Sequence, residues 1–238
     1  MGEAFFHNPS DDQLRQIIFQ PDSVKEKAWI VYVNYMMLAL VSANETEESI
    51  QVKQFRRNMQ IALNDSTIFL EPTEANLQAL TLLAFHGEDY ASPNLSWMLV
   101  GHACRQAEAL GLHALTHGDY DARQRRLCMF WLLFVVDKSC SLAFGRSSFL
   151  PSSLYLDVPL PDFNYMLKFQ PHNASSFSNS KNAPLISTFG AHLLTKGMQF
   201  AKLMGFVLDL LTPGKSLIPK EKVARKLEEW YRQTIEAS

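Results

Sequence analysis

The chain has 238 residues, 47% of them hydrophobic, and a formal net charge of -2 at pH 7. This length and apolar content are sufficient for a large core, and we expect a single domain over residues 1–238. The basic residues are scattered along the sequence, which argues against a surface that follows the phosphates of a nucleic acid. Three cysteines and a start without a secretory signal indicate a reducing compartment.

Apolar residues recur at helical spacing nearly everywhere, and a period of two is not sustained. The sequence therefore predicts an all-α fold, a multi-helix globular domain with a long central buried helix and irregular connecting loops. Residues 151–161 are expected to be extended because prolines restrict them, and residues 172–183, rich in Ser and Asn, to form a flexible loop. The predicted helices are 10–19, 23–42, 44–64, 72–83, 93–110, 119–144, 184–211 and 219–235.

The helix predicted over residues 119–144 is the most informative of these. Between residues 127 and 136 it is apolar on all sides, which is typical of a helix in the centre of a core. Gly145 is placed to end it, and Gly111 to end the preceding helix with a positive φ angle. We predict no membrane span, because the best candidate, residues 28–43, is shorter than the ~20 apolar residues needed and contains Asn34.

Several short blocks between residues 97 and 161 occur in an ordered series. The blocks are Trp97; Ala103, Arg105 and Ala107; Leu110-Gly111-Leu112-His113; Arg125-Arg126-Leu127; Phe130-Trp131; Asp137-Lys138; Gly145-Arg146-Ser147; and Asp157-Val158-Pro159-Leu160-Pro161. Taken together, this series resembles the middle homology region of fungal zinc-cluster transcription factors, a helical regulatory domain. Ser147 stands where that family usually has proline, a change that leaves the turn intact.

The resemblance implies a nuclear protein that regulates transcription by RNA polymerase II. It also implies a DNA-binding module in the same or a partner chain, pairing with a like or unlike chain, and control by a small-molecule effector. Family members bind zinc through an N-terminal cluster of six cysteines, whereas this chain has only Cys104, Cys128 and Cys140, none at metal-ligand spacing. We therefore expect no DNA-binding domain, no cofactor and no direct nucleic-acid binding here, and a fragment or a truncated family member.

Asp137 is the main candidate site residue, because it interrupts the apolar helix and a buried carboxylate needs a partner. The cations that the family pattern offers are Arg105, Arg126 and Arg146. One hypothesis makes Asp137 part of a ligand pocket. The favoured hypothesis makes it a buried ion pair with one of these arginines, which fixes how helices meet.

Other candidates are weaker. Trp97 and Trp131, with Phe130 and Phe134, could line an effector pocket, but aromatic residues at helical spacing are more often core. His113 and His117 have the spacing of two metal ligands, although Gly111 is expected to end that helix and a polar loop is favoured.

No catalytic motif is evident, so we predict that the chain is not an enzyme. Two functions remain open. The first is a regulatory and scaffold domain of a fungal transcription factor. The alternative is a stand-alone helical sensor of small molecules, or a regulator that pairs with full-length transcription factors.

Overall fold

The computed structural model describes residues 6–42, 49–85, 93–114, 118–168, 188–211 and 219–236. Every regular element within these ranges is a helix, which confirms the all-α prediction. The chain divides into two compact units: an N-terminal unit, His7–Gly111, and a C-terminal unit, Leu112–Ser238, with which Met1–Phe6 is grouped. A single domain over residues 1–238 stays a prediction, and the loop expected at 172–183 lies outside the described ranges.

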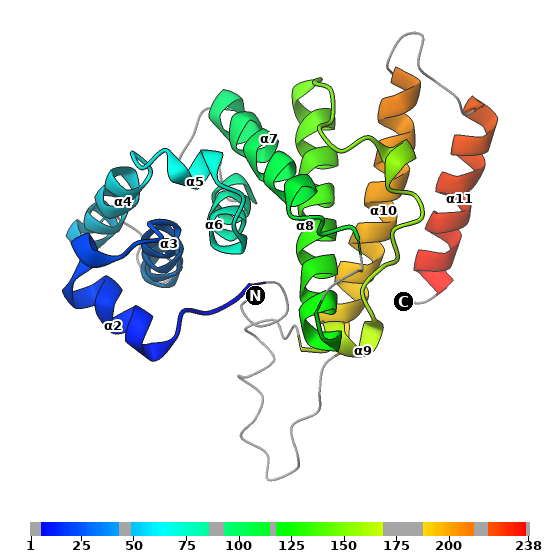
Figure 1. Ribbon diagram of the computed structural model, residues 1–238. Coiled ribbons are helices and arrows are strands. Elements are labelled where there is room, and N and C mark those ends of the chain that lie inside the picture. Colours follow the sequence, from blue (N-terminus) through cyan, green and yellow to red (C-terminus); the bar gives the residue numbers. More distant parts are fainter. Residues whose placement is uncertain are drawn as a thin grey trace. The chain divides into compact units, whose positions relative to one another are not determined.

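The N-terminal unit contains six α-helices among its described residues. In this unit α3 packs against both α4 and α6, and α6 packs against α7 (Figure 1). The bounds are α2 Asp11–Phe19, α3 Ala28–Ser42, α4 Ile50–Ala62, α5 Thr67–Leu70, α6 Glu74–Phe85 and α7 Pro93–Ala109, with a 3-10 turn at Pro21–Ser23. The turn delays α3 relative to the start predicted at residue 23, and the short α5 was not predicted from the sequence.

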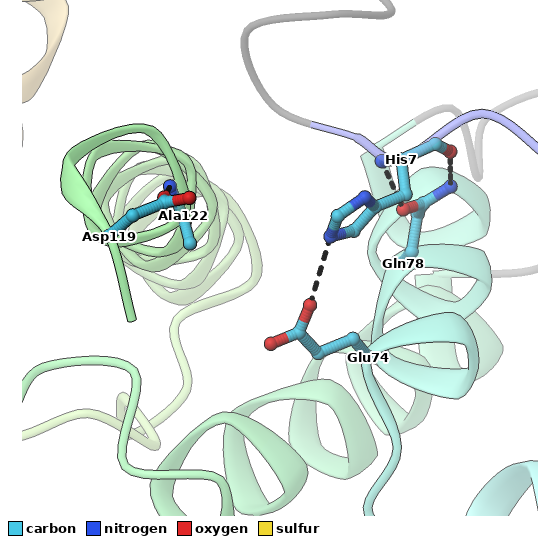
Figure 2. A network of polar contacts seen from close by, with 5 residues as sticks. All are labelled: His7, Glu74, Gln78, Asp119 and Ala122. Atoms are coloured by element: carbon cyan, nitrogen blue, oxygen red, sulfur yellow. Dashed lines mark hydrogen bonds and ion pairs between the residues drawn. The ribbon is translucent and has the colours of Figure 1, made fainter. Parts of the chain in front are cut away.

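Side-chain amides hold the irregular parts of this unit. Gln78 on α6 accepts a hydrogen bond from the backbone N–H of His7 at 2.9 Å and donates to its carbonyl at 2.8 Å, while the ring of His7 lies 3.2 Å from Glu74 (Figure 2). Gln106 on α7 donates to the carbonyl of Ile68 at 2.8 Å. Backbone groups of the N-terminal segment and of the short α5 thus find partners on neighbouring helices, as buried polar groups require.

The C-terminal unit is built on α8, Tyr120–Phe144, the long helix predicted from the sequence. Asp119 caps its first turn by accepting from the N–H of Ala122 at 2.8 Å (Figure 2). Gly145 ends it with φ +62°, a left-handed conformation that favours glycine, and Gly111 also has the predicted positive φ.

Three further helices complete this unit: α9 Phe163–Met166, α10 Phe189–Leu211 and α11 Lys220–Glu236. α10 packs between α8 and α11 (Figure 1). It runs parallel to α8, because Lys202 lies over Trp131 and Gly205 lies beside Lys138. It runs antiparallel to α11, where Phe200 contacts Trp230 and Phe206 contacts Lys226.

Between α8 and α10 the chain returns along α8 in the opposite direction, over residues 145–168, here called the return segment. Three prolines keep most of it out of a long helix, and only a 3-10 turn at Ser152–Leu154 and the four-residue α9 interrupt it. Its backbone groups bond instead to side chains of the long helices. The main contacts are Asp137 with Phe149 and Leu150, Trp131 with Pro159, Gln124 with Asp162, and Lys202 with Leu156 and Val158.

By length and composition α8 could cross a bilayer, but 61% of its most apolar stretch is buried inside the protein. Phe130, Trp131 and Phe134 are at most 1% exposed. Phe130 also contacts Tyr155 of the return segment, with ring centroids 5.2 Å apart. The apolar surface of α8 is therefore core, as predicted, and its length alone does not indicate a membrane span.

Replacement of Trp131 by alanine should destabilise the protein by roughly 3–5 kcal/mol, because it leaves a cavity and removes the donor to the Pro159 carbonyl. The measurement is the free energy of unfolding in urea. Tyr231→Ala, at a side chain on α11 that is 60% exposed, is the matched aromatic control and should change stability by no more than about 0.5 kcal/mol. Equal effects of the two changes would contradict a central position for Trp131.

Candidate functional site

Asp137 lies where α8 meets the beginning of the return segment, and its side chain is fully buried. Its Oδ1 accepts a hydrogen bond from the N–H of Phe149 at 2.8 Å. Its Oδ2 accepts from the N–H of Leu150 at 3.1 Å and from Nζ of Lys138 at 2.9 Å. One carboxylate therefore fixes two successive backbone amides and balances one buried cation.

Lys138 completes the arrangement from the next position of the same helix. It is also fully buried, and Nζ donates to the carbonyl of Leu150 as well as to Asp137. The ammonium group lies 4.3 Å from the centroid of the Phe134 ring, a favourable cation–π position. Together the two side chains bond both the N–H and the carbonyl of Leu150, and we call Asp137, Lys138 and the bonded backbone of Phe149 and Leu150 the Asp137–Lys138 clamp.

The prediction that Arg105, Arg126 or Arg146 is the partner of Asp137 is wrong, because the cation is Lys138. Arg126 lies on α8 eleven residues before Asp137, about 16 Å along the helix axis. Arg105 lies in the N-terminal unit and pairs with Glu108 at 2.7 Å. Arg146 begins the return segment, and its backbone N–H caps α8 by bonding to the carbonyl of Ser141. Neighbouring side chains on a helix normally diverge, so Lys138 could be recognised as the partner only once Leu150 was known to lie between them.

Close packing on α10 holds the same part of the return segment. A Cβ atom added to Gly205 would overlap Oγ of Ser152, lie 2.9 Å from Cβ of Ser152, and lie 3.4 Å from Cε of Lys138. α10 can therefore approach the clamp this closely only with glycine at this position. The need for glycine at 205 was not predicted from the sequence, where it is one glycine inside a long helix.

Further along the return segment, Lys202 of α10 spans two elements. Its Nζ donates to the carbonyls of Leu156 and Val158 at 3.3 and 3.5 Å, and it lies 4.6 Å from the centroid of the Trp131 ring. Burial lowers the pKa of Lys202, and the nearby carboxylate of Asp157 opposes this shift. Burial likewise raises the pKa of Asp209, one turn beyond Gly205, and Lys138 opposes that shift.

The remaining candidates lie apart from the clamp. Trp97 is a half-buried residue of α7 in the N-terminal unit. The ring of His113 lies 5.3 Å from that of Tyr155 and 6.1 Å from that of Phe130, in an aromatic cluster at the side of α8. His117 lies outside the described ranges, and within those ranges no three His, Cys, Asp or Glu side chains group as metal ligands do.

In chemical terms the clamp fixes structure. The carboxylate of Asp137 is occupied by three donors and has no contact with solvent, and the ammonium of Lys138 is shared between a carboxylate, a carbonyl and a ring. Neither group has the access to a substrate that a catalytic acid or base needs. The arrangement can join two segments firmly, and a change at either residue would release the start of the return segment.

Comparison with known proteins gives a consistent result. Residues 14–233 match the family described as the Fungal specific transcription factor domain. A transcriptional regulator of Claviceps purpurea is 27% identical over 221 residues, which are 91% of this chain and 34% of the relative. The Lactose regulatory protein LAC9 of Kluyveromyces lactis is 33% identical over 105 residues, which are 43% of this chain and 12% of that protein.

A third relative, an uncharacterized transcriptional regulatory protein of Schizosaccharomyces pombe, is 28% identical over 60% of this chain and 23% of its own length. The chain thus spans about a third or less of the length of these curated relatives. No solved structure matches it.

The Asp137–Lys138 clamp predicts strong coupling between its two side chains. Asp137→Asn and Lys138→Met should each cost roughly 3–5 kcal/mol, because each leaves a buried charge unpaired. The double variant should cost less than the sum, with a coupling of about 0.5–3 kcal/mol measured by urea unfolding. Arg105→Gln, which removes the exposed arginine first considered as the partner, should add to Asp137→Asn without coupling. Coupling of Asp137 to Arg105 as large as that to Lys138 would contradict the assignment.

Proposed function

This chain belongs to the fungal-specific transcription factor domain family, and we propose that it controls a DNA-binding module in the same or a partner chain. It is a regulatory domain of a fungal transcription factor, as its similarity to transcriptional regulators indicates. In the proposal, the controlled process is transcription by RNA polymerase II and the compartment is the nucleus. The observation that carries the proposal is the family match over residues 14–233, which includes most of both compact units.

The proposal includes the absence of catalysis. The relatives from Claviceps purpurea and Kluyveromyces lactis are regulatory proteins, which supports this part of the proposal. The buried side chains of Asp137 and Lys138 are both engaged in hydrogen bonds within the protein, which supports a structural role for both. We propose that the chain is a helical domain whose conformation influences the other modules. In this domain the clamp holds the return segment against α8.

Zinc in this family would be held by a module outside this chain. Burial raises the pKa of the Cys128 thiol to about 12, which disfavours the thiolate that zinc requires. Cys140 lies on the same helix twelve residues later, about 18 Å along its axis, and Cys104 belongs to the other unit. These three residues do not fit a shared metal site, so we propose that the chain itself has no cofactor.

A fusion experiment tests the proposed control. The chain is placed between a heterologous DNA-binding module and an activation domain, and reporter expression is compared with that of the same fusion lacking the chain. If the chain controls its neighbour, expression should change by about fivefold or more, as a coupling of 1–3 kcal/mol gives. Asp137→Asn should abolish the change, whereas Arg105→Gln, at an exposed pair, should retain it. Equal reporter expression with and without the folded chain would contradict the proposed control.

The chain alone should show no specific binding to DNA. Its net charge is -2 and its basic residues are scattered, so few phosphates could be neutralised at once. Fluorescence anisotropy with labelled duplex at physiological salt should show no saturable binding, and a fusion that carries a zinc-cluster module is the positive control. Tight binding by the chain alone, with affinity falling steeply as salt rises, would be inconsistent with this part of the proposal.

A further inference from the structure

One buried side chain binds the backbone of His7 through both of its polar groups. Oε1 of Gln78 on α6 accepts a hydrogen bond from the N–H of His7 at 2.9 Å, and Nε2 donates to its carbonyl at 2.8 Å (Figure 2). Gln78 is 1% exposed, and a buried amide that loses its partners is unfavourable, so both bonds favour this position of His7. We call these two hydrogen bonds the Gln78 latch.

The residues that follow leave little freedom between the latch and α2. Oδ1 of Asn8 accepts a hydrogen bond from the hydroxyl of Tyr32 on α3 at 3.0 Å. Pro9 has a fixed φ angle and restricts Asn8 to an extended conformation. Ser10 then begins α2 with a capping box. The position of His7 therefore determines where α2 begins.

The helix α2 is weakly held by its own packing. It has nine residues, fewer than the ~12–15 at which an isolated helix becomes marginally stable in water. Ile17 alone is buried among the nine, whereas Ile18 and Phe19 are 59% and 77% exposed. Elements with few buried apolar contacts open at a low free energy, so the order of α2 depends on how its two ends are held.

The end of α2 is attached to the 3-10 turn that follows it. Nε2 of Gln16 donates to the carbonyl and to Oγ of Ser23, at 3.1 and 3.0 Å. The chain then enters the core of the N-terminal unit at Val24, which is buried. Residues 7–23, here called the N-terminal arm, are therefore attached to the unit by the latch at one end and by Val24 at the other.

We propose that the N-terminal arm is a conformational switch that the Gln78 latch closes. With the latch closed, α2 is ordered on the N-terminal unit. With the latch open, the start of the arm is free and α2 unfolds, an order–disorder transition of the kind that many switches use. The role of the switch rests on the proposed function: a DNA-binding module that precedes the arm in the same chain is held by the closed latch and released by its opening.

Two substitutions at His7 separate the latch from the imidazole. His7→Ala and His7→Pro both remove the ring that lies 3.2 Å from Glu74, a pair that contributes little because both side chains are 44% exposed. Only His7→Pro also removes the N–H that Gln78 binds. His7 is half-buried and precedes α2, so neither change alters the packing of the other helices.

Native-state hydrogen exchange on the full chain reports the state of the arm. In the unaltered chain the amides of His7 and of the last turn of α2 should be protected. His7→Pro should lower the protection of α2 by about tenfold or more relative to His7→Ala, with no such difference in α3. Equal protection of α2 in the two variants, or an unprotected α2 in the unaltered chain, would overturn the latch.

A variant on α6 tests the same bonds without a proline. Gln78→Met removes both hydrogen bonds at similar volume and buries no charge. Exchange at His7 and in α2 should accelerate by about tenfold or more, while α3 remains as protected as before. Gln54→Met, the same change at an exposed residue of α4, is the control and should leave exchange in α2 unchanged. Equal exchange in the two methionine variants would contradict the latch.

The fusion reporter, in which the DNA-binding module precedes the chain, tests the role of the switch. His7→Pro should lose most of the expression change that the chain causes, whereas His7→Ala should retain it. An equal change with both variants would overturn the role of the latch while leaving the proposed function in place. If no form of the chain changes expression, the proposed function fails and the role of the switch fails with it, whereas the exchange results still decide whether the latch holds the arm.

Discussion

The buried charge pair of Asp137 and Lys138 is the constraint on which the C-terminal unit depends. The return segment has to pass along the side of α8 although its prolines prevent it from forming a long helix of its own. Its backbone groups would then be buried without partners, at a cost of about 1–3 kcal/mol each. The Asp137–Lys138 clamp removes that cost at Phe149 and Leu150, because it supplies their hydrogen-bond partners. The same hydrogen bonds offset the cost of burying the two charges.

The same logic extends along the segment. Trp131 donates a hydrogen bond to the carbonyl of Pro159, and Lys202 of α10 donates to the carbonyls of Leu156 and Val158. Gly205 allows α10 to pack closely against Ser152 of the return segment. The long helices therefore hold an irregular segment in one path. A regulatory domain needs such a defined body, because a change of state can be communicated only between arrangements that are each well specified.

Most of the helices could be predicted from the sequence because their signals are local. Ser10 and Asp119 cap helices at the predicted starts, and Gly145 ends α8 where the apolar run stops. The path of the return segment could not be predicted, since it depends on contacts between residues far apart in the sequence. Asp137 was recognised as a buried charge, but its partner was not, because an adjacent lysine becomes a partner only when backbone lies between the two. The close approach at Gly205 is non-local for the same reason.

Native-state hydrogen exchange at two amides tests this account most directly. If the carboxylate of Asp137 holds the N–H groups of Phe149 and Leu150, both should exchange as slowly as the central amides of α8, although neither lies in a helix. Exchange at both should accelerate in Asp137→Asn by a larger factor than exchange at the centre of α8 does. Rapid exchange of Phe149 and Leu150 in the unaltered protein would contradict the account, because the return segment would then not be held by the buried pair.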